Sequence, residues 1–226
     1  MCVVIGTLIL KDEFRVHLIK KINKDMDEFM DATNEEDELQ IILRGHIYIE
    51  HEIEKMLINH LVEPSVIMGD RNRLNFNTKL KLAVALGLLP KDKKSPYDKL
   101  GGLRNKYAHK LNYKMTESDL NELVDSMDKE IRSNVFEREW NVKREMTDEK
   151  RQLLKLKRSL LSLWVYVSKL VHTLSLNEFE KRIEELEARY IESDDKAKVK
   201  IEAERKELFN KLRNEVGITE ESCLNF

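Results

Sequence analysis

The chain has 226 residues, of which 36% are charged and only seven are glycine and three are proline. So few turn-forming residues indicate long helices, and the composition predicts an all-α protein with a sizeable core. The formal net charge of −2 excludes a general electrostatic attraction to nucleic acid or to acidic membranes, so any RNA binding must rest on local patches.

The N-terminal part, residues 1–35, is predicted to form a separate segment. Residues 1–10 are apolar but lack a basic leader and are too short to span a bilayer, so we expect a packed segment and no membrane partner. Apolar residues at helical spacing predict an amphipathic helix over 11–33. Cys2 and Cys223 fit no metal or redox spacing, which favours reduced thiols in a cytoplasmic protein.

The next helix is predicted over 37–62, with Asn34 as its candidate cap and Pro64 behind its end. His46 and Glu50 stand one turn apart on this helix, which is a spacing that metal ligands use. Two candidate ligands do not make a coordination shell, so no metal site is predicted.

Two loops with basic residues precede the central motif. Arg71 and Arg73 lie in the first loop, where solvated charges are more common than phosphate contacts. A short helix over 77–88 separates the loops, and because it is apolar on two sides we expect it to be buried between neighbours. Lys93 and Lys94 end the second loop and are candidate contacts for a phosphodiester backbone.

The stretch 101–110, Gly-Gly-Leu-Arg-Asn-Lys-Tyr-Ala-His-Lys, gathers the chemically useful residues. Ser95 as N-cap, Pro96 at the first helical position and Asp98 near the positive end of the dipole predict the start of the helix that carries it. A buried face is predicted from residues that recur every three or four positions, namely Leu100, Leu103, Tyr107 and Leu111.

The directions of the side chains on this helix determine whether one chain can form a complete site. Gly101 and Gly102 each weaken the helix by about 1 kcal/mol, which indicates either close approach of another helix or a kink. Asn105 and His109 are one turn apart and face the same way. Arg104 lies about 140° around the helix from His109, so the two meet only through the long arginine side chain or across to another chain.

The C-terminal half begins with a helix predicted over 116–127, capped by Thr116 with Asp119. From Thr147 to Leu174, leucine and valine residues step by alternating three and four, which is a heptad seam. Basic residues interrupt the seam and exclude a membrane span. The segment is interpreted as a long bundle helix or as part of a dimer interface.

Residues 176–226 form a densely charged arm with two narrow apolar stripes. Ser193 to Asp195 either cap a second helix, which gives a helical hairpin, or are absorbed into one long rod. The predicted domains are therefore the N-terminal segment 1–35, a helical bundle over 36–175 and the arm.

Residues 104–109, Arg-Asn-Lys-Tyr-Ala-His, resemble the Arg-x4-6-His signature of the HEPN superfamily, small α-helical domains that include many prokaryotic RNase toxins. With the apolar stretch 79–89, the likeness extends to the mannitol-repressor branch and covers residues 38–127. Arg44 and His51 match the looser signature, but only the match at 104–109 lies just inside a capped helix after a short loop, with Asn directly after Arg. The resemblance implies a HEPN-like helical bundle, here with a long charged C-terminal helix or hairpin.

The candidate site suits RNA cleavage without a metal or other cofactor, because no glycine-rich phosphate loop or Cys/His cluster is present. His109 is the predicted proton-transfer residue, Arg104 binds the scissile phosphate, and Asn105 orients His109 or contacts the substrate. Further candidates for substrate binding are Lys106, Lys93 and Lys94, and Glu50 or Glu54 is expected to support Arg104 in the folded bundle.

The predicted partners follow from the chemistry and from the resemblance. Cleavage through the 2′-hydroxyl needs a base and an acid, and a homodimer supplies the second histidine. The resemblance implies a toxin or phage-defence effector that acts on RNA and is held in check by an antitoxin protein. Leu111 stands where some HEPN toxins carry Tyr, so regulation by tyrosine modification there is not expected.

A non-catalytic alternative stays open at this point. The mannitol-repressor branch resembles a regulator that binds other proteins, and the charged arm fits that role. Arg104 would then pair with Glu50 or Glu54, and His109 would be a structural residue bonded to Asn105. A plain coiled-coil scaffold would explain the arm but not the signature.

Overall fold

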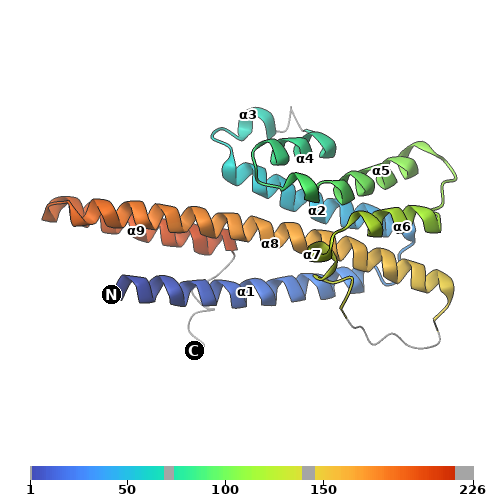
Figure 1. Ribbon diagram of the computed structural model, residues 1–226, viewed down its shortest axis with the longest axis horizontal. Coiled ribbons are helices and arrows are strands. Elements are labelled where there is room, and N and C mark those ends of the chain that lie inside the picture. Colours follow the sequence, from blue (N-terminus) through green and yellow to red (C-terminus); the bar gives the residue numbers. More distant parts are fainter. Residues whose placement is uncertain (1, 69–73, 139–145, 217–226) are drawn as a thin grey trace. The chain divides into compact units, whose positions relative to one another are not determined.

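The computed structural model describes residues 2–68, 74–138 and 146–216. Within these ranges the regular structure is helical and no β-strand occurs, so the all-α prediction is confirmed. The elements in chain order (Figure 1) are α1 Cys2–Ala32, α2 Glu38–His60, α3 Ser65–Met68, α4 Phe76–Ala85, the 3-10 helix η1 Lys91–Lys93, α5 Ser95–His109, α6 Glu117–Ser126, α7 Lys129–Arg132, α8 Asp148–Ile191 and α9 Asp195–Val216.

Helix starts are set by residues with extended backbone and an oxygen that accepts from the first turn. Thr116 caps α6 in a reciprocal box with Asp119, as predicted. Asn34 is not the cap of α2, because Asp37 has the extended conformation and accepts from the backbone of Gln40 at 2.9 Å. A short polar side chain alone therefore does not locate a cap, since the backbone must also leave the helical region at that residue.

The two other predicted caps are displaced for the same reason. Asn75, not Asn77, has the extended backbone and accepts from the amide of Thr78 at 2.9 Å, so α4 begins earlier than expected. Ser95 is already the first residue of α5, because Lys94 at its start keeps a helical backbone as η1 runs into α5. Pro96 is therefore the second helical residue and not the first as predicted, whereas the predicted position of Asp98 in the first turn is confirmed.

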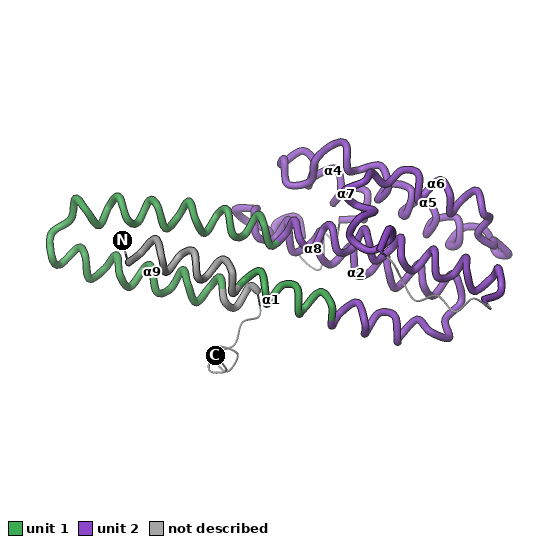
Figure 2. Tube along the Cα trace, turned by 60° about the horizontal axis from the view of Figure 1, so that its bottom comes forward, with its two compact units in different colours: residues 1–23, 172–226 green, residues 24–171 purple. Residues whose placement is uncertain are grey.

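The chain divides into two compact units, one made of Met1–Asn23 and His172–Phe226 and the other of Lys24–Val171 (Figure 2). Helices α1 and α8 each contribute to both units. The N-terminal segment expected over 1–35 is thus divided at residue 23, and the expected start of the arm at 176 lies close to the unit boundary at 172.

The first unit contains a helical hairpin. Helix α8 ends at Ile191 and α9 begins at Asp195, where Asp194 accepts from the amide of Ala197 at 2.9 Å, so the hairpin is observed and the single rod is not. Its core joins both predicted apolar stripes with α1. The buried residues are Phe14, Phe179, Ile183 and Leu212, with Leu176, Leu208 and Phe209 packed against them.

The second unit has α2 at its centre, with α4 and α5 packed against α2 and α6 packed against α5. Gly45 marks a close helix approach, because a Cβ there would lie 2.7 Å from the Cδ1 atom of Leu160 on α8. The heptad seam of α8 is core, as interpreted above. Its buried residues in this unit include Leu156, Leu160, Leu163 and Val167.

Helix α8 is long and apolar enough to cross a membrane by length and composition alone. In the structure 67% of its most apolar 18-residue window is buried. Burial of this kind is typical of the core helix of a folded domain, because lipid-facing residues would have no protein neighbours to pack against.

Candidate functional site

Helix α5 carries the Arg-Asn-Lys-Tyr-Ala-His motif and is anchored by its apolar face. Leu100 and Leu103 are buried, and the hydroxyl of Tyr97 donates to the carbonyl oxygen of Leu163 on α8 at 3.1 Å. The prediction that Leu111 is the fourth residue of this buried face is wrong. Leu111 is 100% exposed, because α5 ends at His109 and the backbone beyond it is extended.

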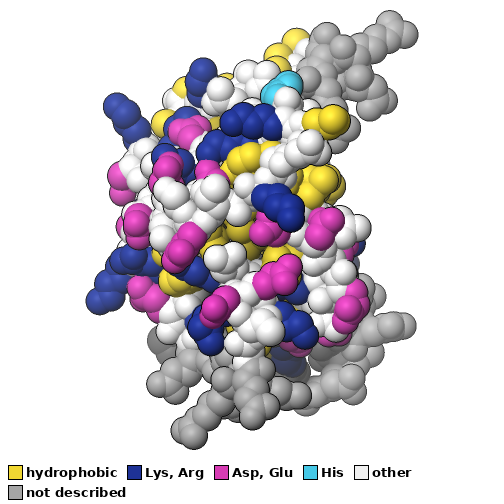
Figure 3. Space-filling view, turned by 90° about the vertical axis from the view of Figure 1, so that its right-hand side faces the viewer, with side chains coloured by type: hydrophobic (Ala, Val, Ile, Leu, Met, Phe, Trp, Pro, Cys, Tyr) yellow, Lys and Arg dark blue, Asp and Glu magenta, His cyan; other side chains and the backbone are white. Residues whose placement is uncertain are grey.

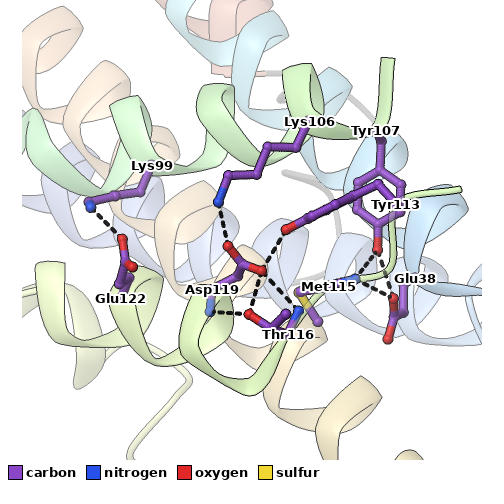
Figure 4. A network of polar contacts seen from close by, with 9 residues as sticks. All are labelled: Glu38, Lys99, Lys106, Tyr107, Tyr113, Met115, Thr116, Asp119 and Glu122. Carbon is purple, nitrogen blue, oxygen red and sulfur yellow. Dashed lines mark hydrogen bonds and ion pairs between the residues drawn. The ribbon is translucent and has the colours of Figure 1, made fainter. Parts of the chain in front are cut away.

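The side of α5 that packs on α6 is covered by a polar network (Figure 4). Lys106 pairs with Asp119, which also accepts from the hydroxyls of Tyr113 and Thr116 at 2.6 Å each. Burial alone would raise the pKa of Asp119, but the hydrogen bonds from Lys106, Thr116 and Tyr113 outweigh it and lower that pKa. The carboxylate therefore stays ionised and ties α5 to the start of α6.

A second part of the network ties α5 to α2. The hydroxyl of Tyr107 donates to the Oε2 atom of Glu38 at 2.7 Å, and the amide of Met115 donates to the same oxygen at 3.2 Å. Burial and the bond to Glu38 raise the pKa of Tyr107. The C-terminal end of α5 and the loop after it are thus held on both flanks, which fixes the direction in which the motif residues face.

The three lysines predicted to bind substrate are each paired with carboxylates. Lys106 pairs with Asp119 and Lys94 with Asp98. Lys93 is buried and pairs with Asp128 and Glu130, through side-chain hydrogen bonds that raise its pKa. On the face drawn in Figure 3, basic and acidic side chains are interspersed rather than gathered by sign. These lysines therefore do not form an open basic patch.

A cavity of about 490 Å³ lies between α2, α4 and α5. Helix α2 contributes one wall, the start of α4 a second, and α5 a third. Its polar lining consists of His46, Glu50, Asn75, Asn77, Arg104 and Asn105, with Asp98 at α5. The cavity thus brings together two motif residues with side chains from two other helices.

Arg104 differs from the other cations nearby. It is exposed at the cavity, and its Nη1 atom donates to the Oδ1 atom of Asn105 at 3.4 Å. Among the residues that the structure describes, it has no carboxylate partner. By contrast Arg44, the arginine of the looser motif match, is paired with Glu36.

The expected supporting acids are engaged elsewhere. Glu50 and Glu54 both pair with Lys79, which is completely buried. Glu50 nevertheless lines the same cavity as Arg104, as expected, whereas Glu54 is not part of its lining. The ion pair between Arg104 and either acid, which the regulatory alternative required, does not occur in the structure.

His109 is the last residue of α5 and is exposed. It does not line the cavity, and no hydrogen bond joins it to any residue that the structure describes. Asn105 bonds Arg104 instead of orienting His109. Within one chain, the structure therefore brings Arg104 and Asn105 together and leaves His109 one turn beyond Asn105, about 140° around the helix from Arg104.

His46 was considered in the sequence only as a metal ligand, and the described residues contain no cluster that would hold a metal. It is 8% exposed, packs its ring against Phe76 at 4.3 Å between centroids, and lines the cavity. Burial lowers its pKa, with Arg104 and Lys79 acting in the same direction and Glu50 opposing them. The imidazole is therefore neutral near pH 7. Only the fold shows that it lines the same cavity as Arg104.

Gly101 and Gly102 do not mark a close approach of another helix within the chain. A Cβ at Gly101 would lie 3.4 Å from the ring of Phe76, which is ordinary contact, and a Cβ at Gly102 would meet nothing within 4 Å. Both residues line the cavity. The missing side chains leave this space open, while the tight helix crossing occurs at Gly45.

Comparison of the chain with protein-family models, with curated proteins and with solved structures gave no match. The HEPN resemblance therefore rests on the motif residues themselves. The structure adds to it the all-helical fold and the cavity beside Arg104.

Proposed function

We propose that this protein is a metal-independent endoribonuclease of HEPN type. The observation that carries the proposal is the guanidinium of Arg104, which lies at a cavity without a carboxylate partner among the described residues, whereas Lys93, Lys94 and Lys106 are each paired with a carboxylate. An arginine kept unpaired in this way is suited to bind a phosphate bidentately.

The proposed reaction needs no group beyond the protein and the RNA. The 2′-hydroxyl loses its proton to a base, its oxygen forms a bond to the adjacent phosphorus, and the bond from phosphorus to the 5′-oxygen breaks. A proton from an acid neutralises the leaving 5′-oxygen, and the products are a 2′,3′-cyclic phosphate and a 5′-hydroxyl. In this scheme Arg104 stabilises the charged phosphorane, Asn105 contacts the phosphate, and His109 transfers a proton.

A homodimer is part of the proposal because His109 and Arg104 are not joined within one chain. A second copy can bring its His109 to the phosphate bound at Arg104. Helix α2, which forms one wall of the cavity, carries an apolar stripe that faces solvent and offers a surface for such a copy. Its residues are Leu39, Leu43 and Ile47, of which Ile47 is 63% exposed.

By the same resemblance, the biological role that we propose is that of a toxin or phage-defence effector in the cytoplasm, controlled by an antitoxin protein. The exposed, unpaired state of His109 and Arg104 leaves both accessible to RNA or to an inhibitor.

The test is incubation of the purified protein with mixed single-stranded RNA in EDTA. We expect cleavage by the wild-type protein with cyclic phosphate ends, and none by His109→Ala. An equal mixture of wild-type and His109→Ala chains that exchange partners should keep about a quarter of the activity of the same amount of wild-type protein, because only a quarter of the dimers then hold both histidines. Retention of half of the activity would contradict the shared site, and no cleavage by the folded wild-type protein would contradict the nuclease.

The second candidate function is a non-catalytic, protein-binding regulator of mannitol-repressor type. It is favoured by the pairing of Lys93, Lys94 and Lys106 with carboxylates, which leaves little positive charge for an RNA backbone. Absence of cleavage together with unchanged folding of the His109→Ala chain would support it.

A further inference from the structure

The cavity between α2, α4 and α5 combines an apolar floor with a polar rim. Its apolar part is formed by Phe76, Leu80 and Tyr97. The Tyr97 hydroxyl donates to the carbonyl oxygen of Leu163, so it is not available to a ligand in the cavity. The polar lining carries Arg104, His46 and side-chain amides, together with the carboxylates of Glu50 and Asp98, which are paired with Lys79 and Lys94. A cavity of this kind favours a flat apolar ligand that also bears an anionic group and hydrogen-bonding edges.

The burial and the missing hydrogen bonds of the His46 ring point to a ligand in the cavity. His46 is nine-tenths buried in the cavity wall, yet no hydrogen bond joins its ring to any residue in the described part of the chain. The nearest carboxylate oxygen, Oε2 of Glu50, is 3.5 Å from its Nδ1 atom, which is longer than a good hydrogen bond. Buried polar groups are normally bonded, and with Nδ1 beside Glu50 it is the Nε2 atom that has no partner among the described residues and is available to a ligand.

A second polar side chain lines the cavity at the start of α4. The Oδ1 atom of Asn75 accepts from the amide and the hydroxyl of Thr78, at 2.9 and 3.0 Å, in capping α4. Its exposed amide nitrogen has no partner among the described residues and can donate to a ligand.

We propose that this cavity binds one nucleotide, with the base against Phe76 and His46 and the phosphate at Arg104. The inference names a base-binding subsite for the proposed ribonuclease and rests on that function for its biological role, but binding can be measured without cleavage.

A nucleotide fits these groups better than other anions do. A sugar phosphate or a small carboxylate would use Arg104 but would leave the Phe76 ring and the apolar floor unoccupied. A purine or pyrimidine stacks on aromatic rings and has donors and acceptors on its edge for the imidazole and the amide. Arg104 then supplies the charge for the attached phosphate.

The surface of α5 provides a path from the cavity to His109. Asp98, Gly102, Asn105 and His109 follow one another at four, three and four residues, so they lie along one side of the helix. Asn105 and His109 are about 6 Å apart along the helix axis. The absent side chain of Gly102 leaves this side open beside the cavity, so a strand whose base enters the cavity can continue past Asn105 to His109.

The experiment is isothermal titration calorimetry of the full chain, in EDTA, with the four ribonucleoside 3′-monophosphates. The four nucleosides and inorganic phosphate are titrated separately. We expect at least one nucleotide to bind roughly tenfold or more tightly than either its nucleoside or phosphate, because stacking and the charged contact both contribute. Equal affinity for phosphate and for every nucleotide, or no binding of any nucleotide, would overturn the proposal.

Variants locate the binding. His46→Phe keeps a ring against Phe76 but removes both nitrogens, and Gly101→Leu extends a side chain from the wall that faces Phe76. Each should weaken nucleotide binding roughly tenfold or more, with inorganic phosphate binding changed less. Lys99→Ala, on the α6 side of the same helix, is the control and should bind as wild type does. Circular dichroism melting identifies a variant that fails to fold, and the other then carries the test.

The two proposals fail in different ways. Nucleotide binding that depends on His46 in a protein that cuts no RNA would remove the ribonuclease and keep the subsite. Cleavage of RNA that depends on His109, with His46→Phe and Gly101→Leu binding nucleotides as wild type does, would remove the subsite and keep the ribonuclease.

Discussion

The two sides of helix α5 hold their charged residues differently. On the side toward α6, Lys99 pairs with Glu122 at 2.7 Å and Lys106 pairs with Asp119, in the network of Figure 4. On the side toward the cavity, Arg104 bonds the neutral amide of Asn105 and no described carboxylate. One side uses its charges to fix the helix in place. The other keeps a charge available for a ligand.

The largest effect is expected from replacing the cation on the cavity side of α5, and a cation on the α6 side serves as the control. Arg104→Ala should lower the rate of RNA cleavage by about 100-fold or more, because it removes the group that stabilises charge in the transition state. Arg104→Lys should restore only part of the rate, since an ammonium lacks the bidentate fork. The measurement is single-turnover cleavage of a labelled RNA. Lys99→Ala should keep the wild-type rate, and equal losses in Lys99→Ala and Arg104→Ala would abolish the distinction between the two sides.

The next effect concerns the buried cation beside the cavity. Lys79→Met should lower the free energy of unfolding by about 4 kcal/mol, because it leaves Glu50 and Glu54 close together without their shared cation. Urea denaturation measures the change. Lys81→Met, at an exposed lysine of the same helix, is the matched control and should change stability by less than about 0.5 kcal/mol. A change of similar size in both would show that the buried pair contributes nothing specific.

On the α6 side, Asp119→Asn should lower the free energy of unfolding by about 3 kcal/mol at pH 7, because four donors lose a charged acceptor. The pKa of Asp119 is lowered in the folded state, so its contribution is complete above the unfolded pKa of about 4 and is lost as the pH falls below it. Denaturation from pH 7 to pH 2 should therefore narrow the difference in stability between the variant and the wild type, which closes only below the folded-state pKa. A constant difference over this range would contradict the assignment.

The smallest effects are expected at two glycines, Gly102 beside open space and Gly45 in a packed helix crossing. Gly102→Ala should raise the free energy of unfolding by up to about 1 kcal/mol, because alanine favours the helix and its Cβ meets no atom within 4 Å. Gly45→Ala has the same gain in helix propensity but should lower stability by about 1 to 2 kcal/mol, since its Cβ would lie 2.7 Å from a buried leucine. Thermal melting of both variants checks the opposite signs.

Local sequence rules determined much of this protein. Scarce glycine and proline gave an all-α prediction that the structure confirms, and the Thr116 capping box and the heptad seam of α8 are found where they were predicted. These features depend on residues a few positions apart along one helix. The caps at Asn34, Asn77 and Ser95 were misplaced because the backbone conformation that selects a cap depends on how the preceding segment packs.

The presence of the cavity and the residues that line it depend on the tertiary structure alone. The motif identified Arg104 and Asn105, but no spacing along the chain shows that Phe76 and His46 line the same cavity. Nor does it show that Lys79 forms ion pairs with both Glu50 and Glu54. The same limit explains why Lys93, Lys94 and Lys106 were predicted to be available for substrate. Whether a charged side chain is paired depends on residues that reach it from other helices, and the sequence of one helix does not contain that information.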